Sequence, residues 1–586
     1  MAEIRNPNAS TPGAGGGDTR SMLLFTLLAL GALMAFQYFR PPTPPQTQPP
    51  AAAATNAGSS LPAAQTPAAP TAAPAVHAAA ESTTIVENSL YRITFTNRGA
   101  QVKSWILKRY KDSQGHPLDL VNQAAATRFG YPLSLYTYEP QLTTELNSAL
   151  YEPSVTGQVD APTGIVFRYA AGALTVTKTF LFNQSYVIDV KVAVEENGQP
   201  VRALVSWPSG LGDLDEAAQY NYSKFAFSSD NKRDTIAARK VSGGSTMNQP
   251  LDYAGPIDLY FTATFLPNNP SDATAVTLHH AMDVPRDRAD AKSRQISEPV
   301  LGVAVGEQSG VTHTRLFAGP LQYDVLGSIH TTAPDGKATG EDLRPLVQYG
   351  WFKFIAEPLF LLLRFVHDHL ISNWGWSIIV ITIAFNLLML PTRFTMMKSS
   401  LKMQRIQPKL DAVKRKYANL KATDPRRAEM NAETMKLYKE EGVNMYGGCL
   451  PMLVQLPLFY GYYRVLLNAI ELRQASWGWL PNLAAADPLH ILPITIIVSM
   501  FLVQYISPSP GMDPAQRRMM AFMMPAIFGF SMWGFASGLA LYWATGNLLN
   551  IALQVGINRS KLGRELNELA RRRAAAKRPK TIQARR

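Results

Sequence analysis

Polar side chains that interrupt apolar segments are the first candidates for chemistry in this sequence. Thr382 and Asn386 stand four residues apart within the apolar run 374–391, so on a helix they would share one face. In lipid, such groups either hold neighbouring helices together by hydrogen bonds or line a polar cavity. The sequence leaves both interpretations open.

Arg464 lies in a second apolar segment, which also contains Leu456, Phe459 and Tyr463. An arginine inside a spanning helix is costly, so it should face protein or a wet cavity. Leu456, Phe459 and Tyr463 recur at helical spacing, which predicts that they share one face. Ordinary packing between helices explains these three residues equally well.

Other residues that could act as catalysts or metal ligands do not form a recognisable constellation. They are the adjacent His279 and His280, the loop carboxylates Asp213, Asp215 and Glu216, and His367 with His369. Adjacent histidines point apart on a strand, and histidines two apart do not share a helical face. We interpret the loop carboxylates as solvated, because they lack the ligand spacing and downstream glutamate of a Ca²⁺ loop. A single cysteine, Cys449, excludes an intramolecular disulfide. We therefore expect no catalytic residue, no metal and no cofactor.

The elements that would position these residues follow from the apolar runs, because a spanning helix takes roughly 20 residues. The run 21–39 is interpreted as an uncleaved signal anchor, with a cleaved signal peptide as the alternative. The predicted order is an inner N-terminus 1–20, span 21–39, a Pro/Ala-rich linker 40–80, an outer β domain 81–348, an amphipathic interfacial helix 349–372, span 373–391, an inner helical hairpin 392–446, span 447–470, an outer loop 471–487, span 488–507, an inner loop 508–518, spans 519–536 and 538–557, and a basic inner tail 558–586.

Charge assigns the sides of the membrane. Residues 81–345 carry 23 Lys/Arg against 28 Asp/Glu, whereas the tail 558–586 carries 11 Lys/Arg against two glutamates. Positive loops beside spans normally mark the cytoplasmic side, so both termini and the hairpin are predicted inside. DNA binding is the alternative explanation for the charge of the hairpin.

The region 81–345 is built differently from the spans. Short runs of β-branched and aromatic residues alternate with turn signals such as Asn-Gly and Gly-Gly. This pattern predicts a large antiparallel β-sandwich.

Several sequence blocks together resemble the YidC-type membrane protein insertases of Gram-negative bacteria, over essentially the whole chain. They are YGWFKFIAEPLF at 349–360, NWGWSIIVIT at 373–382, QPKL at 407–410, GGCLPMLVQLPLF at 447–459, ELRQA at 471–475, DPLHILPI at 487–494 and SGLALYW at 537–543. The resemblance implies a multi-domain inner-membrane protein. Its parts would be six transmembrane helices (five of them an insertase core), a periplasmic β-sandwich and a cytoplasmic helical hairpin.

The same resemblance implies a function without covalent chemistry. Hydrophobic segments of nascent proteins would move from the cytoplasm into the bilayer through a hydrophilic groove, alone or with the Sec translocon, and would be helped to fold and assemble. The implied partners are nascent membrane proteins, components of the Sec translocon, the targeting machinery at the hairpin, the ribosome at the basic tail, and lipid.

The groove residues implied by the resemblance include one departure from the family pattern. They are Thr382, Asn386, Leu456, Phe459, Tyr463, Tyr542 and Trp543. The family usually carries an arginine at the position of Asn386. We hypothesise that Arg464 supplies the groove's positive charge instead, in which case replacing it by Ala or Leu should abolish complementation of an insertase-depleted cell. Arg393 is the other candidate, with a membrane-edge anchor as its alternative role.

Two other classes of protein remain as rivals. A secondary transporter would suit an intramembrane arginine, but the sequence shows no internal repeat and no matching pair of interrupted helices. A membrane-anchored scaffold would act through the β region, so deleting about residues 90–330 would inactivate a scaffold but not an insertase core.

Overall fold

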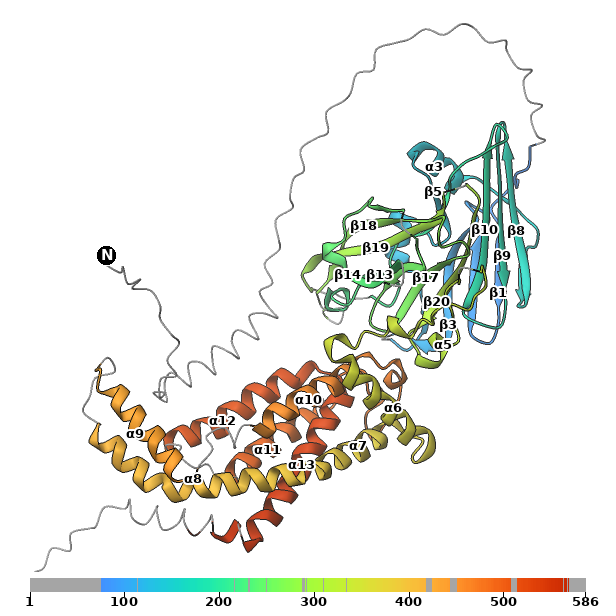
Figure 1. The fold of residues 1–586 in the computed structure, drawn as a ribbon. Coiled ribbons are helices and arrows are strands. Elements are labelled where there is room, and N and C mark those ends of the chain that lie inside the picture. Colours follow the sequence, from blue (N-terminus) through green and yellow to red (C-terminus); the bar gives the residue numbers. More distant parts are fainter. Residues whose placement is uncertain are drawn as a thin grey trace, which may run out of the picture.

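The chain folds into a β-rich domain joined to a group of helices (Figure 1). The structure, a computed structural model, describes residues 75–568 apart from 113, 215–216, 230–231, 249, 287–289, 291, 309, 334, 418–423, 443–449, 507–513, 562 and 566–567. The predicted first span, most of the predicted linker and most of the basic tail lie outside the described residues. We call residues 75–348 the β domain and residues 353–559 the helical core.

Three sheets form the β domain. The largest has the order β14 (Lys232–Ala237), β13 (Lys224–Ser229), β16 (Tyr253–Ile257), β17 (Phe261–Pro267), β20 (Thr312–Pro320), β10 (Val187–Glu196), β9 (Leu174–Phe182), β8 (Thr163–Ala171) and β6 (Glu152–Pro153), with β11 (Gln199–Pro200) beside β10. The second has the order β4 (Pro117–Asp119), β3 (Gln101–Lys111), β2 (Tyr91–Thr96), β1 (Thr83–Glu87) and β7 (Gly157–Asp160). The third has the order β15 (Thr246–Met247), β18 (Ala273–Pro285), β19 (Gln295–Glu307), β12 (Leu204–Trp207) and β5 (Ser134–Tyr136).

The prediction of a large β-rich domain is confirmed, with one difference in strand direction. In β9, buried residues alternate with more exposed ones, as expected for a strand with one face on a core. The phenyl rings of Phe95 and Phe180 lie 5.2 Å apart between two of the sheets. The described pairings are antiparallel except that of β1 with β7, which is parallel.

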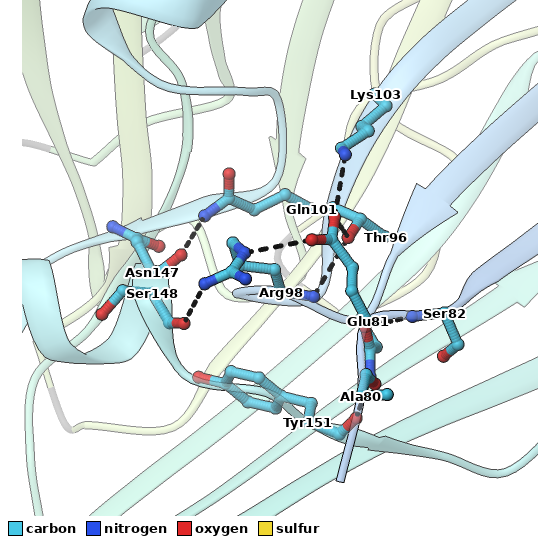
Figure 2. Close-up of polar contacts among 11 residues, drawn as sticks. Ala80, Glu81, Ser82, Thr96, Arg98, Gln101, Lys103, Asn147, Ser148 and Tyr151 are labelled. Carbon is cyan, nitrogen blue, oxygen red and sulfur yellow. Dashed lines mark hydrogen bonds and ion pairs between the residues drawn. The ribbon is translucent and has the colours of Figure 1, made fainter. Parts of the chain in front are cut away.

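Near the start of the β domain, Glu81 forms hydrogen bonds with side chains of the β2–β3 hairpin (Figure 2). Its carboxylate accepts hydrogen bonds from Lys103 at 2.8 Å, Thr96 at 2.9 Å and Arg98 at 3.3 Å. The hydrogen bond from Lys103 is the largest of the effects that lower the pKa of Glu81 to about 2. Gly99 lies in the adjoining turn at φ +66°, and a Cβ there would lie 2.5 Å from the carbonyl of Asn147, so the turn requires glycine.

The helical core contains eight described α-helices. They are α6 (Lys353–His369), α7 (Trp374–Leu388), α8 (Leu390–Lys416), α9 (Arg427–Glu440), α10 (Leu450–Asn468), α11 (Ile491–Ile506), α12 (Pro514–Ser531) and α13 (Ser537–Arg559). Among the described residues, no helix meets both the length and the hydropathy expected of a membrane span. The α8 and α9 helices contact each other through Ile406, Leu410, Leu437 and Tyr438, while large apolar side chains are exposed at Trp351, just before α6, and at Phe354 and Phe365 within it.

The β domain meets the helical core around the loop that follows α10, and this contact corrects one prediction. Asp213 is not a solvated carboxylate: it accepts two hydrogen bonds from Arg473, at 2.7 and 2.8 Å. The side chains of Arg473 and Asp213 are only 10% and 14% exposed. The two residues are 260 positions apart in sequence, so the sequence pattern around Asp213 gave no sign of its partner. Asp215 and Glu216 lie outside the described residues.

Candidate functional site

A ladder of polar groups runs along α7 on the side that faces α13. Thr382 is fully buried, and its Oγ1 donates to the Ile378 carbonyl at 2.7 Å. One turn further on, Asn386 Nδ2 donates to the Thr382 carbonyl at 2.8 Å. A Cβ at Gly546 of α13 would lie 3.8 Å from Thr382 and 4.0 Å from Asn386. Both polar side chains therefore lie on one face, against a glycine that lets the helices approach closely.

Arg393 adds a positive charge to this ladder. It lies in the first turn of α8, seven residues after Asn386, and its Nη2 donates to Asn386 Oδ1 at 3.0 Å. A guanidinium bound to an amide oxygen is held in place while its remaining N–H groups stay available as donors. The neutral residue at position 386 is thus in direct contact with an arginine from the next helix.

Aromatic side chains of α10 and α13 form a wall beside the ladder. The ring centroid of Phe459 lies 4.9 Å from that of Trp543 and 6.2 Å from that of Tyr542. Trp543 also contacts Phe528 of α12, at 4.2 Å. The structure therefore brings Phe459 together with Tyr542 and Trp543, which follow it by more than 80 positions in the sequence.

Tyr462 is a member of this wall that the sequence analysis missed. Its ring lies 4.8 Å from Tyr542 and 6.1 Å from Phe385, so it connects α7, α10 and α13. The residue is 1% exposed, and its hydroxyl has no hydrogen-bond partner among the described residues. A signal was present in the sequence, because Tyr462 follows Phe459 by three residues and so shares its helical face.

Two other predicted residues lie along α10 at either end of the wall. Leu456 is 51% exposed, towards the start of the helix. Tyr463 is partly buried and packs against the apolar core, and its neighbour Tyr460 lies with its ring 6.1 Å away. Both residues lie on the helix that carries Phe459. Among the described residues, the ring of Tyr463 does not contact that of Tyr542 or Trp543, and Leu456 is aliphatic and largely exposed.

Arg464 lies away from the polar ladder, at the junction with the β domain. Its Nη2 donates to the backbone carbonyl of Gln348, the last residue of the β domain. Lys224 of β13 donates to the side-chain oxygen of the same glutamine. The residue predicted to charge the groove therefore contacts the β domain, whereas Arg393 contacts the predicted groove residue Asn386.

No group of three or more His, Cys, Asp or Glu side chains is arranged to hold a metal ion in the part of the chain that the structure describes. His280 stacks on Phe129 with ring centroids 4.3 Å apart, and His367 stacks on Trp374 at 3.9 Å. The candidate site is therefore the polar ladder, to which Arg393 adds a positive charge, beside the aromatic wall of α10 and α13.

Comparison with known proteins gives two family matches that together span most of the chain. Residues 83–362 match the model of the YidC periplasmic domain, and residues 365–564 match that of the 60Kd inner membrane protein. A membrane protein insertase YidC from Citrifermentans bemidjiense is 32% identical over 575 residues, covering 92% of this chain and 99% of that protein. One from Geobacter sulfurreducens is 32% identical over 484 residues, covering 80% of this chain and 85% of that protein.

A crystal structure of an active YidC insertase with its first transmembrane domain resolved is also similar. It is 16% identical, with a TM-score of 0.32, and the match covers 81% of this chain and 94% of that one.

Proposed function

Since this chain belongs to the YidC family of membrane protein insertases, we propose that it transfers hydrophobic segments of nascent proteins from the cytoplasm into the inner-membrane bilayer. The observation that carries this proposal is the polar ladder of α7 beside the aromatic wall of α10 and α13, within a chain that matches both family domains. No covalent step is required. Burial of the substrate's apolar residues in lipid provides the driving force, at about 25 cal/mol per Å².

On the proposed path, the polar ladder of α7 lies on one side of the incoming segment and the aromatic wall of α10 and α13 lies on the other. Polar groups of a substrate lose several kcal/mol when they enter hydrocarbon unpaired. Asn386 and Arg393 would offer hydrogen bonds to those groups, and Arg393 would attract acidic ones, while the buried Thr382 would hold Asn386 in place through its backbone carbonyl. The apolar part of the segment would slide past Phe459 and Trp543 towards lipid, with Leu456 at the start of the same helix. In this chain, therefore, Arg393 would supply the charge that the family usually carries at position 386.

The finer architecture belongs to the same proposal. The chain would cross the membrane six times, at 21–39 and at five segments centred on α7, α10, α11, α12 and α13. Its β domain would lie in the periplasm, and its termini and the hairpin of α8 and α9 in the cytoplasm. Loop charges support this arrangement, since 392–441 and 558–586 carry the positive residues expected on the inner side.

The proposed partners follow from the same charges. The tail 558–586 would bind ribosomal RNA by a salt-dependent attraction, while anionic lipid would attract it too. The hairpin would receive substrates from the targeting machinery, and the Sec translocon would cooperate for some substrates. A chain truncated at Gly556 should lose ribosome co-sedimentation; undiminished binding would exclude the tail as the ribosome contact.

Complementation of an insertase-depleted cell tests the function. The full chain should restore growth, and a chain lacking residues 90–330 should still support growth, although with less efficient insertion because Arg473 loses its partner Asp213. A requirement for the deleted region would favour the scaffold. Arg393→Met should impair insertion of a substrate with an acidic flank more than that of its neutral counterpart, and equal impairment would contradict the role given to Arg393.

A further inference from the structure

Two arginines of the helical core reach into the β domain, and they do so in different ways. Arg473, in the loop after α10, forms the ion pair with Asp213 and donates to the Lys111 carbonyl at 2.9 Å. Its guanidinium also lies over the rings of Tyr260 and Phe261, at 5.4 and 5.1 Å. The charge of Arg473 is therefore paired with a carboxylate, and its guanidinium has several hydrogen-bond acceptors. Arg464, by contrast, has a guanidinium nitrogen, Nε, without a hydrogen-bond partner among the described residues.

Three buried polar atoms around Arg464 have no hydrogen-bond partner among the described residues. They are Arg464 Nε, Gln348 Nε2 and Asp258 Oδ2. Asp258 is 6% exposed, and its other oxygen accepts from the backbone N–H groups of Tyr260 at 2.7 Å and Phe261 at 2.6 Å. An unpaired buried polar group destabilises the folded state, so three such groups around one residue call for a common explanation.

All three residues line one small cavity between α10 and the β domain. Its volume is about 20 Å³, and a buried water needs at least roughly 10–15 Å³ on this measure. The polarities are complementary, because the two nitrogens are donors and the carboxylate oxygen is an acceptor. One water can accept from Arg464 Nε and Gln348 Nε2 and donate to Asp258 Oδ2, which is the usual number of hydrogen bonds for a buried water.

We propose that Arg464 is a positioning residue through which the β domain grips the outer end of α10, in a clasp that a single buried water completes. The direct part of the clasp is the hydrogen bond from Arg464 to the Gln348 carbonyl. The indirect part is the water that connects Arg464 and Gln348 to Asp258. Lys224 holds the Gln348 side chain from the other side, so the glutamine is fixed between two cations.

The clasp would set the position of the helix that carries the aromatic wall. Arg464 follows Phe459 by five residues, and Asn468 donates back to the Arg464 carbonyl at 2.6 Å. Along the same helix, Gly461 packs so closely on α6 that a Cβ would lie 2.9 Å from Ile355 Cγ2. Contact with α6 fixes α10 near its middle, and the clasp fixes its outer end, so together they hold Phe459 opposite the aromatic rings of α13. This role rests on the proposed function, but the clasp itself can be tested without it.

Hydrogen exchange in the full chain, held in lipid nanodiscs, tests the clasp. The amides of Leu346, Val347 and Tyr349 are hydrogen-bonded beside Gln348 and should report its release. Arg464→Met should raise their exchange about 10- to 150-fold, which is the range expected for the loss of a hydrogen bond from a charged group. Arg405→Met is the matched control, because Arg405 pairs with Glu565 far from the junction, and it should leave these amides unchanged.

Asp258→Asn tests the water. Asn can keep the acceptor for the two backbone N–H groups while it turns a donor towards the cavity. At pH 8, where Asp258 is largely ionised, the single variant should raise exchange by a smaller factor than Arg464→Met, which also removes the direct hydrogen bond to Gln348. The double variant should exceed Arg464→Met by little, because the water link is already lost when Arg464 is replaced. If the effects of Asp258→Asn and Arg464→Met are additive, the water link is overturned. If Arg464→Met leaves exchange unchanged, the clasp itself is overturned. Unaltered protection of β9 and β10 controls for folding.

Insertion measurements then test the positioning role. One substrate is prepared with a neutral and with an acidic flank. Arg464→Met should lower insertion of both by the same factor, and Arg464→Lys, which retains a donor for the Gln348 carbonyl, should recover part of it. A loss confined to the acidic flank would show instead that Arg464 acts as a groove charge. If insertion is absent even in the unaltered chain, the proposed function fails while the exchange result still decides the clasp.

Discussion

Removing the charge of Arg473 should open the junction between the β domain and the helical core. The ion pair with Asp213 is bidentate and largely buried, and removing one partner of such a pair costs about 3–5 kcal/mol. The lost stacking on Tyr260 and Phe261 adds about 0.5–1 kcal/mol. Arg473→Met would also leave the charge of Asp213 unpaired near Asp258. Burial and the charge of Asp213 already raise the pKa of Asp258 to about 7. We expect a total of about 4 kcal/mol at pH 8, or roughly a 1,000-fold larger opening constant.

Hydrogen exchange measures this opening at the amides of Leu472 and Ala475, which are hydrogen-bonded in the turn after α10. The loss should shrink at pH 5, where protonation of a carboxyl removes the repulsion between Asp213 and Asp258. The double variant Asp213→Leu with Arg473→Met should recover most of the loss, because an apolar pair can replace a buried ion pair at little cost. The charge argument is refuted if the double variant opens as readily as Arg473→Met.

Three further changes test other parts of the structure. Lys178→Met should destabilise the β domain by roughly 3 kcal/mol in denaturant unfolding, because it leaves the buried carbonyls of Gly99 and Leu133, now 2.7 and 2.9 Å from Lys178 Nζ, without a donor; an unchanged midpoint would contradict this. The closed junction should gain roughly 5 kcal/mol as the pH falls from 8 to 5, because burial raises the pKa of both Asp258 and Glu471 to about 7, so that the closed state binds both protons more tightly. Asp258→Asn should remove about half of that gain and leave the part due to Glu471; a flat profile in the unaltered chain would argue against this explanation. Gly461→Val should loosen α10 from α6 and lower thermal stability by about 1–3 kcal/mol, whereas Gly556→Val, where a Cβ meets nothing within 4 Å, should have a smaller effect; equal effects would exclude close packing at Gly461 as the cause.

Local sequence pattern was sufficient for the elements and for contacts along one helix. Alternation of apolar residues predicted strands such as β9, and a spacing of four residues placed Thr382 and Asn386 on one face, where Asn386 now donates to the Thr382 carbonyl. The resemblance to the family singled out Phe459, Tyr542 and Trp543 together, and the structure brings their rings into contact.

Long-range partners were beyond the reach of the sequence pattern. Arg464 and Gln348 are 116 residues apart, and Arg473 and Asp213 are 260 apart. A charge pattern predicts which residues avoid hydrocarbon, but not which element satisfies them. Arg464 was therefore expected in the groove because it interrupts an apolar helix, whereas the β domain, folded from the preceding half of the chain, offers it a carbonyl.

Site-specific photocrosslinking of a nascent membrane protein tests the central claim, that substrates pass the aromatic wall of α10. A photoreactive residue in place of Phe459 should crosslink the hydrophobic segment during insertion. The same residue in place of Phe530 on α12, which is 78% exposed, should crosslink lipid and not the nascent chain. Crosslinking from both positions alike, or none from position 459 while insertion proceeds, would contradict the account.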